Sequence, residues 1–561
     1  MFLPTTAAEL KSLGWKQPDV ILVTGDTYID SPQIGAAVIG KYLWKHGFKT
    51  ALIAQPAVGD GRDITRLGVP ALFWGVTAGS IDSMVANYTR LNKFRHQDDY
   101  TPGGVNVRPN RATIVYTNLI RQHFKPAQPI VLGGIEASLR RIAHYDCWDD
   151  AVRRSLLFDA KADILAYGMA EKTVIELAAA FRDGADWRNI KGICYITSTP
   201  AGGKILLPSF DEVAAHKPAF RRMSLLFDRH ADHPSPGFIQ QHGDRFLIHN
   251  PPPPPLSTTE LDEVSDLEFA GDAHPYYKTG EIRALATIKQ SITTHRGCIG
   301  HCNFCAIAVH QGRQVVSRSP QSIMAEAARI SQAAGFNGII YDVGGPTANM
   351  YGLSCRKGWA CQNKHCLMPK ICPQLGFGHR AQIEILRLLL GLPGIKKVFV
   401  ASGIRPDLVM ADQEQGRRYI AQLARHHVSG QIKLAPEHSE SAVLKLMNKP
   451  APESLIKFKD AFDSACAASG KSYYMTYYLM AAHPGCTKEH MQRLKSFLAS
   501  GLKTTPEQAQ IFTPTPATLS TAMYHCETDM AGNKIFCEKN LQAMQKQKEL
   551  IRGRYAGRGS N

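Results

Sequence analysis

Residues 291–305 read SITTHRGCIGHCNFC and place three cysteines directly behind a short, strand-like stretch. Three residues separate Cys298 from Cys302, and two separate Cys302 from Cys305. Ferredoxins that only carry electrons bind every iron of a 4Fe–4S cluster through cysteine. Three thiolates at this spacing therefore predict a cluster whose fourth iron has no protein ligand and can bind another molecule.

Two other interpretations of these cysteines are open. A structural zinc site would need a fourth ligand, which here would be His295, His301 or His310. The spacing, with Phe304 before the third cysteine, is not typical of a zinc ribbon, so zinc is the less favoured alternative. A disulfide framework is less favoured still, because MFLPTTAAEL lacks the parts of a signal peptide and no apolar run reaches membrane length. We therefore expect a cytoplasmic protein with no membrane segment and with reduced, metal-bound or buried cysteines.

Size and charge allow several domains and more than one kind of partner. A chain of 561 residues should hold roughly two to four domains. Its net charge of +17 favours polyanionic partners such as RNA or an acidic protein surface. The basic residues are spread along the whole chain, so a basic enzyme with no nucleic-acid role is equally compatible.

The chain from residue 290 alternates strand and helix patterns. The stretches that we expect to be strands are residues 291–296, 338–343, 397–402, 431–436, 472–480 and 509–514. Six strands joined by helices predict a partial (β/α)6 barrel over residues 290–530. Chemistry in such barrels gathers at the carboxyl ends of the strands, where the cysteine loop falls.

The first 196 residues show the same alternation with different strand ends. Apolar runs at 19–24, 50–54, 71–76, 129–134 and 163–168 predict a doubly wound, Rossmann-like parallel sheet. This domain resembles the cobalamin-binding domain of many radical S-adenosylmethionine (SAM) proteins. The Asp-x-His-x-x-Gly loop of those domains is missing, and we do not predict cobalamin. Gly133, Gly134 and Glu136 lie at a strand end where such sheets bind ligands, although a glycine-rich turn is the favoured interpretation.

Two further segments complete the expected organisation. Residues 197–289 include PPPPP at 251–255 and are expected to form a stiff connecting segment. Residues 531–561 end in GRYAGRGSN and are expected to form a flexible basic tail.

The three-cysteine spacing, with Phe304 before the last cysteine, resembles the signature of the radical SAM superfamily. The resemblance implies a 4Fe–4S cluster on Cys298, Cys302 and Cys305, with SAM bound to the open iron. It also implies one-electron cleavage of SAM to a 5′-deoxyadenosyl radical, and Phe304 would lie in the cofactor site.

The remaining strand ends are then candidates to bind SAM. Gly344 and Gly345 follow the second strand, where the superfamily has a Gly-Gly-Glu motif, but Pro346 replaces the acidic residue. A SAM contact and a simple turn are equally favoured there. Further candidates follow the third, fourth and fifth strands: Ser402, Arg405 and Asp407; Glu437 and His438; and His483, which is ranked low. Salt bridges or helix caps are the competing interpretations.

A second group of cysteines follows the second strand. It consists of Cys355, Cys361, Cys366 and Cys372. Four thiols with Gly, Pro and Lys between them predict either an auxiliary 4Fe–4S cluster or a structural zinc site. We favour the iron–sulfur cluster modestly, and free thiols are the minority alternative.

Longer stretches resemble the YgiQ-type radical SAM family over nearly the whole chain. They include GGIEASLRRIAHYDCW, HRGCIGHCNFCAI, DVGGPTANMYG and FTPTPATLSTAMYHC. The resemblance implies a radical SAM enzyme of unknown substrate, served by a flavodoxin- or ferredoxin-type electron donor and by iron–sulfur assembly machinery. The barrel half is also similar to the tRNA methylthiotransferases, so modification of RNA or a ribosomal protein is an alternative. A non-catalytic iron–sulfur or zinc scaffold is another.

Overall fold

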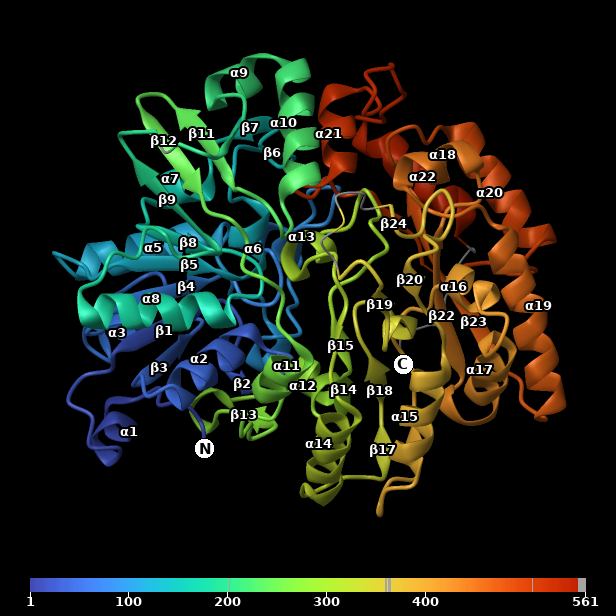
Figure 1. Ribbon diagram of the computed structural model, residues 1–561, viewed down its shortest axis with the longest axis horizontal. Coiled ribbons are helices and arrows are strands. Elements are labelled where there is room, and N and C mark those ends of the chain that lie inside the picture. The colour runs from blue at the N-terminus through green and yellow to red at the C-terminus, as the bar shows by residue number, and fades with distance from the viewer. Residues whose placement is uncertain (201, 359–360, 362–364, 507, 553–561) are drawn as a thin grey trace. The chain divides into compact units, whose positions relative to one another are not determined.

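The protein is described by a computed structural model that covers residues 1–200, 202–358, 361, 365–506 and 508–552 (Figure 1). The chain divides into two compact units. Unit 1 comprises Met1–Lys289, Ala306–Gly312 and Thr515–Ala517, and unit 2 comprises Gln290–Cys305, Arg313–Pro514 and the chain from Thr518 onward. No helix within the described ranges is long and apolar enough to cross a bilayer.

Unit 1 is built on a sheet whose described strands have the order β10-β11-β12-β9-β8-β5-β4-β1-β3. Its parallel part consists of β3 (Thr50–Ala54), β1 (Val20–Thr24), β4 (Phe73–Thr77), β5 (Ile130–Gly133) and β8 (Ile164–Ala166). Every residue of β1 and β3 is buried, because helices cover both faces of a doubly wound sheet. Helices α2 (Gly35–Lys45) and α8 (Glu171–Asp183) pack together and contribute to one core with β1. The Rossmann-like prediction is confirmed.

The expected connecting segment, residues 197–289, contributes three strands to this sheet and also contains helices. Strands β11 (Phe238–His242) and β12 (Arg245–His249) form an antiparallel hairpin, and β12 pairs with β9 (Ile193–Thr197). The short β10 (Ile205–Leu206) adds to the edge beside β11. The two-residue turn contains Gly243, whose φ of +65° suits glycine. The prolines begin only after β12 ends, so they do not disturb the sheet.

Unit 2 contains parallel strands whose neighbours follow the order of the chain. Strand β14 (Ser291–Thr293) pairs with β18 (Asp342–Gly344), and β17 (Ile339–Ile340) pairs with β21 (Lys397–Val398). Ile404 then bridges to Leu434 in β22 (Gln431–Glu437). The series continues from β22 to β23 (Tyr474–Ala481) and to β24 (Gln510–Ile511).

Helices separate these strands, as the partial (β/α)6 barrel predicts. They include α14 (Pro320–Gln332), α15 (Arg380–Leu390), α17 (Gly416–Gln422), α19 (Glu453–Ala468) and α20 (Lys488–Ser500). Helix α15 buries Ile385, Leu386 and Leu389, which lie on one face of the helix. Parallel strands joined by such amphipathic helices place their carboxyl ends at one rim.

The expected flexible tail is ordered as far as the structure describes it. Helix α22 (Leu541–Ile551) buries Met544 and Ile551 and packs against α20. Gln547 is also buried, and its Oε1 accepts a hydrogen bond of 3.1 Å from the backbone N–H of Ala482. Apolar residues on one helical face explain this packing, which the basic composition of the segment conceals. Residues 553–561 of the predicted tail lie outside the described residues.

Candidate iron–sulfur site

The three cysteines lie in the loop that follows β15 (His295–Arg296). The Sγ of Cys298 accepts a hydrogen bond of 3.4 Å from the N–H of Gly300 and lies 3.4 Å from Thr347 Oγ1. The N–H of Cys305 donates to the carbonyl of Cys302 over 3.0 Å, which turns the chain back after the second cysteine. All three cysteines are residues of intermediate exposure.

Gly300 lies against two of the sulfur atoms and against Arg405, whose Nη1 would be 2.7 Å from a Cβ at this position. A Cβ placed on this glycine would lie 3.3 Å from Cys298 Sγ and 3.6 Å from Cys302 Sγ. The two thiols therefore face a common cradle that an alanine would already begin to fill. This cradle and the soft thiolate chemistry of its donors fit an iron–sulfur cluster.

No three His, Cys, Asp or Glu side chains in the described part of the chain converge on a single metal ion. A 4Fe–4S cluster needs no such convergence, because each cysteine binds a different iron. Burial and the neighbouring Cys302 raise the pKa of Cys298, so its free thiol is protonated and metal binding must release that proton.

Arg405 is the charged residue next to this cradle. Its Nε donates to Asp407 Oδ1 over 3.0 Å and its Nη2 donates to Asp407 Oδ2 over 2.7 Å, which is a side-on ion pair. Its Nη1 lies 3.9 Å from Cys302 Sγ. Burial would lower the pKa of Arg405, but Asp407 and the cysteine sulfurs outweigh burial and raise it. The salt bridge that competed with a SAM contact is present, and it is buried.

A chain of hydrogen bonds lies behind Arg405. Asn349 binds both the N–H and the carbonyl of Arg405, at 2.9 and 3.0 Å. The amide of Asn349 also lies 3.3 Å from His379 Nε2, and His379 Nδ1 lies 2.8 Å from Asp412 Oδ2. His379 stacks on Tyr419 with ring centroids 4.6 Å apart. Sequence reasoning missed Asn349, His379 and Asp412, because their spacing along the chain carries no motif.

The second and third strands meet at Asp342 and Ser402. Asp342 Oδ1 accepts the N–H groups of Ala401 and Ser402 at 2.8 and 3.1 Å, and the Ser402 hydroxyl donates to Asp342 Oδ2. A Cβ on Gly344 would lie 3.1 Å from Ser402 Oγ. Asp342 was also missed by sequence reasoning, although it lies only two residues before Gly344. The Ser402 hydroxyl is thus held by a carboxylate, and its assignment as a SAM ligand stays a prediction.

Gly345 lies against a buried imidazole. A Cβ there would lie 2.5 Å from His295 Cε1, so tight packing by itself requires glycine. Burial lowers the pKa of His295 to about 4, and its Nε2 donates to the Thr347 carbonyl over 3.1 Å. His295 therefore supports the cysteine loop as a neutral side chain. Whether Gly344 and Gly345 also contact SAM stays a prediction.

Glu437 ends the fourth strand in a strained conformation. Its φ of +68° is rare for a residue with a side chain, and such strain is concentrated at functional sites. Burial raises the pKa of Glu437, and Lys449 partly opposes that shift. Lys449 is itself buried and donates to the carbonyl of Ala435 over 2.5 Å. The role of Glu437 in binding ribose hydroxyls stays a prediction.

The two histidines on this rim are buried, and their roles as site residues stay predictions. Burial lowers the pKa of His438 and of His483 to about 3. His438 accepts the N–H of Glu440 at Nδ1 over 3.0 Å, and His483 Nε2 lies 2.7 Å from Ser520 Oγ. Phe304 makes an edge-to-face contact with His483, with ring centroids 6.2 Å apart. Phe304 therefore has an aromatic partner in this unit, and a contact with the cofactor stays a prediction.

The second group of cysteines is only partly described. Cys355 ends β19 (Ser354–Cys355), and the N–H of Cys372 donates to the carbonyl of Cys366 over 2.8 Å. Burial raises the pKa of Cys366 to about 11, with further contributions from Cys355, Cys372 and Cys361. The four thiols therefore lie close enough to interact electrostatically. Residues 359–360 and 362–364 lie outside the described residues, and the metal at this site stays a prediction.

The carboxyl edge of the sheet in unit 1 is closed by its own ion pairs. Arg108 is buried after β4, and its Nη2 lies 2.8 Å from Asp26 Oδ1 and 2.9 Å from Asp98 Oδ2. A Cβ on Gly25 would lie 2.3 Å from the Ala78 carbonyl oxygen, and a Cβ on Gly79 would lie 2.2 Å from Asp26 Oδ1. There is no space here for even a methyl group.

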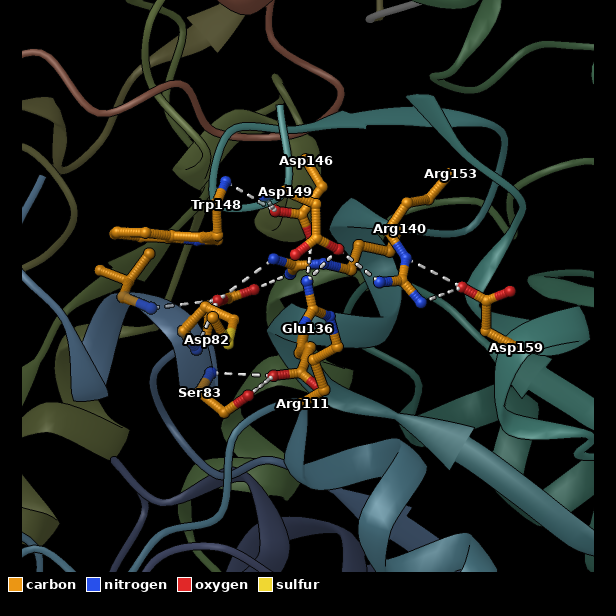
Figure 2. A network of polar contacts seen from close by, with 12 residues as sticks. Asp82, Ser83, Arg111, Glu136, Arg140, Asp146, Trp148, Asp149, Arg153 and Asp159 are labelled. Carbon is orange, nitrogen blue, oxygen red and sulfur yellow. Dashed lines mark hydrogen bonds and ion pairs between the residues drawn. The ribbon is translucent and has the colours of Figure 1, made fainter. Parts of the chain in front are cut away.

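Glu136 forms the next part of the same edge (Figure 2). It is buried after β5, and it accepts hydrogen bonds from the N–H and hydroxyl groups of Ser83 and of Thr113. Gly134 has a φ of +80°, and a Cβ there would lie 2.3 Å from Thr77 Oγ1. The glycine-rich turn, with Gly133 as its first residue, therefore has a structural reason that needs no ligand.

Further ion pairs surround Glu136 in Figure 2. Arg140 pairs with Asp82, which also caps helix α4 (Ser83–Asn87). The other pairs join Arg111 to Asp146 and Asp149, and Arg153 to Asp149 and Asp159. Each of these cations has a carboxylate partner, so the network is neutralised within unit 1.

Comparisons with known proteins agree with the fold and the cysteine loop. Residues 2–291 match the radical SAM N-terminal family, and residues 292–498 match the radical SAM superfamily. The chain is therefore a radical SAM protein. A UPF0313 protein of Fusobacterium nucleatum is 50% identical over 98% of both chains, and one of Thermotoga maritima is 46% identical over 100% of both. The chain belongs to the UPF0313 family, which is the YgiQ-type family that its sequence resembles.

Two solved structures have a similar fold at low sequence identity. The radical SAM methyltransferase TsrM of Kitasatospora setae, with cobalamin and a 4Fe–4S cluster bound, has a TM-score of 0.50. It is 14% identical over 90% of this chain and 76% of its own. The cobalamin-dependent radical SAM enzyme OxsB also has a TM-score of 0.50, at 13% identity over 90% of this chain and 55% of its own. These similarities confirm the fold class.

Cobalamin in these similar structures raises the question whether unit 1 fits the same group. The ends of β1 and β4 are packed against Arg108, Asp26 and the Ala78 carbonyl, which crowd the backbone at Gly25 and Gly79. The residues at this edge do not fit cobalamin, and we derive no step through it.

Proposed function

We propose that this chain is a radical SAM enzyme that binds one 4Fe–4S cluster through Cys298, Cys302 and Cys305 and binds SAM at the open iron. The observation that carries the proposal is the cradle beside Gly300, where two of the sulfur atoms face one space at the end of the first barrel strand. When bound, the cluster and SAM supply one-electron cleavage of SAM and a 5′-deoxyadenosyl radical.

The residues of unit 2 have separate tasks in this proposal. The cysteines bind the cluster, and the Thr347 hydroxyl lies against the sulfur of Cys298. Gly344 and Ser402 line the strand ends where SAM would bind, and Glu437 offers a carboxyl group for its ribose. The substrate is not assigned by any of these contacts.

Anaerobic reconstitution with iron and sulfide tests the proposal. Reduced wild-type protein should convert SAM to 5′-deoxyadenosine, measured by chromatography and mass spectrometry. Cys302→Ala should lose this activity and part of the bound iron. Cys466→Ala, which removes a buried thiol from helix α19, is the matched control and should behave as wild type. Cleavage of SAM by Cys302→Ala would reject the assignment, and absence of 5′-deoxyadenosine from loaded wild type would favour a scaffold.

The net charge of +17 favours a second, narrower proposal, in which the substrate is RNA or a ribosomal protein. Binding of tRNA or rRNA that weakens steeply with salt would support it, and absence of binding at low salt would contradict it. The enzyme would work in the cytoplasm, loaded by iron–sulfur assembly machinery. A flavodoxin- or ferredoxin-type protein would supply its electron.

A further inference from the structure

We propose that Arg405 is a fixed cationic donor to the sulfur of Cys302 and makes the cluster easier to reduce. The inference rests on the proposed function, because it assigns a role toward the cluster that Cys298, Cys302 and Cys305 would hold. It differs from a role in gripping the SAM carboxylate.

The hydrogen bonds of the guanidinium leave one side for the cluster. Asp407 occupies Nε and Nη2, which form the edge that grips a carboxylate in a bidentate manner. Only Nη1 points away from Asp407, and it lies 3.9 Å from Cys302 Sγ. The same Nη1 lies 2.7 Å from the point where a Cβ of Gly300 would be. The free end of Arg405 therefore lies beside Gly300 and next to the sulfur atom of Cys302.

The position of Arg405 is set from behind by its backbone. Asn349 binds its N–H and its carbonyl, and the Asn349 amide is in turn held at His379 Nε2. The carboxylate of Asp412 accepts from His379 Nδ1, which leaves Nε2 as the acceptor for Asn349. Asn349, His379 and Asp412 are thus positioning residues for the guanidinium.

Arg405 is buried, and burial strengthens the electrostatic effect of its charge on neighbouring groups. Only 6% of Arg405 is exposed, so water screens the charge weakly. Among the described residues, Asp407 faces Arg405 directly, and Lys449 lies near Asp407. Asp407 neutralises the side of the guanidinium away from Cys302, so the positive end of the pair is directed at the cysteine.

Reduction of the cluster adds one electron from an external low-potential donor and makes the cluster one charge more negative. A cation and a hydrogen-bond donor at a ligating sulfur stabilise that more negative form. Removing them should therefore lower the reduction potential. This effect exists without SAM and without substrate.

The experiment measures iron content and reduction potential in the reconstituted full chain, by titration with dithionite followed by EPR. Removing Arg405 alone would leave Asp407 buried and unpaired, so the test variant is Arg405→Met with Asp407→Leu. Its equilibrium constant for one-electron reduction should fall at least about tenfold, a shift of about 59 mV. Asn349→Ala should shift the potential in the same direction by less. Arg380→Met, at an exposed ion pair of the same unit, should leave the potential unchanged.

The outcomes separate the inference from the proposed function. A fully loaded double variant with the wild-type potential would overturn the inference and leave the proposed function standing. A change in SAM affinity with no change in potential would also overturn it, in favour of a SAM ligand. If the double variant takes up no iron, Asn349→Ala decides by the same titration. Wild-type protein that binds no iron would overturn the proposed function itself.

Discussion

The two units end their parallel strands in different chemistry. In unit 1 the strand ends carry carboxylates that are matched by buried arginines, as in the contacts of Arg108 with Asp26 and Asp98 at 2.8 and 2.9 Å. In unit 2 the thiols of Cys298 and Cys302 have only weak contacts, at 3.4 to 3.9 Å. The carboxylates at the first edge are paired with buried arginines, and the second edge has thiols that can still bind a metal.

This difference teaches that the position of a strand end does not by itself identify a ligand site. Both edges are where such sheets bind ligands in general. Function has to be argued from the residues at the site. A group whose hydrogen bonds are already complete loses them when a ligand binds, and a protonated thiol exchanges only a proton for a metal.

The largest effect should come from breaking the closed edge of unit 1. Arg108→Met leaves Asp26 and Asp98 buried without their partner, and should lower the free energy of unfolding by about 3–5 kcal/mol. Urea unfolding followed by tryptophan fluorescence is the measurement, because five of the six tryptophans are in unit 1. Arg62→Met removes an exposed partner of Asp60 and should change nothing measurable. Equal stability of the Arg108 variant and wild type would show that this edge is not held by its ion pairs.

Alanine at the two crowded glycines should separate stability from metal binding. Gly79→Ala places a Cβ 2.2 Å from Asp26 Oδ1 at a φ of +103°, and should destabilise unit 1 by at least about 2 kcal/mol. Gly300→Ala places a Cβ 2.7 Å from Arg405 Nη1 and should mainly reduce the iron bound after reconstitution.

The controls for these glycines are Gly35→Ala in unit 1 and Gly403→Ala in unit 2, where an added Cβ would meet no atom within 4 Å. Both should retain stability and iron content. If Gly300→Ala binds iron as well as Gly403→Ala, the cradle beside Gly300 is not where the cluster forms.

Acid should weaken unit 1 through buried neutral histidines. His242 lies between Phe158 and Phe210, and burial lowers its pKa to about 3. In the unfolded chain the imidazole of His242 binds a proton below a pKa of about 6.5, whereas in the folded chain it stays neutral down to a pH near 3. The contribution of neutral His242 to the free energy of unfolding is therefore complete above pH 6.5. It then falls by about 1.4 kcal/mol per pH unit as the pH decreases toward 3.

The variant His242→Phe tests this by removing one titrating group. Its unfolding free energy should fall less steeply than that of wild type between pH 6.5 and pH 5, by about 1.4 kcal/mol per unit. Urea unfolding at several pH values measures the slopes. Parallel slopes would mean that His242 becomes charged within the folded protein.

The smallest expected effect is a null response to cobalamin. Hydroxocobalamin mixed with the full chain should separate from it on gel filtration, with no cobalamin absorbance in the protein fraction. The crowding at Gly25 and Gly79 is the physical reason. Co-elution of cobalamin and protein in equimolar amounts would show that the carboxyl edge of the unit 1 sheet can bind a ligand. The proposed difference between the two units would then be wrong.

Much of the fold follows from local patterns. Residues 50–54 and 431–436 form predicted strands, because apolar periodicity reports which face is buried. The predictions of a stiff connecting segment and of a flexible tail were wrong because they relied on the proline and basic composition of these segments rather than on their apolar periodicity. The prolines at 251–255 follow the β11–β12 hairpin and do not extend into it. The basic composition at the end of the chain conceals the apolar face of α22.

The candidate site was predictable only in part. The cysteine spacing is a local feature, and so is the pairing of Arg405 with Asp407 two residues later. Asn349, His379 and Asp412 are brought together from three separate loops. No local sequence pattern identifies these three residues, because their hydrogen-bond partners are distant in the sequence.

The sequence alone determined the class of this protein, because ligand spacing in one short loop is a covalent property of the chain. It also determined the alternation of strands and helices, which depends on neighbours a few residues apart. Only the tertiary structure decided that Arg405 turns one nitrogen toward Cys302 while Asp407 holds the others, and that Arg108 closes the sheet of unit 1. Those arrangements depend on burial and on partners distant in sequence, which set the strength of each charge.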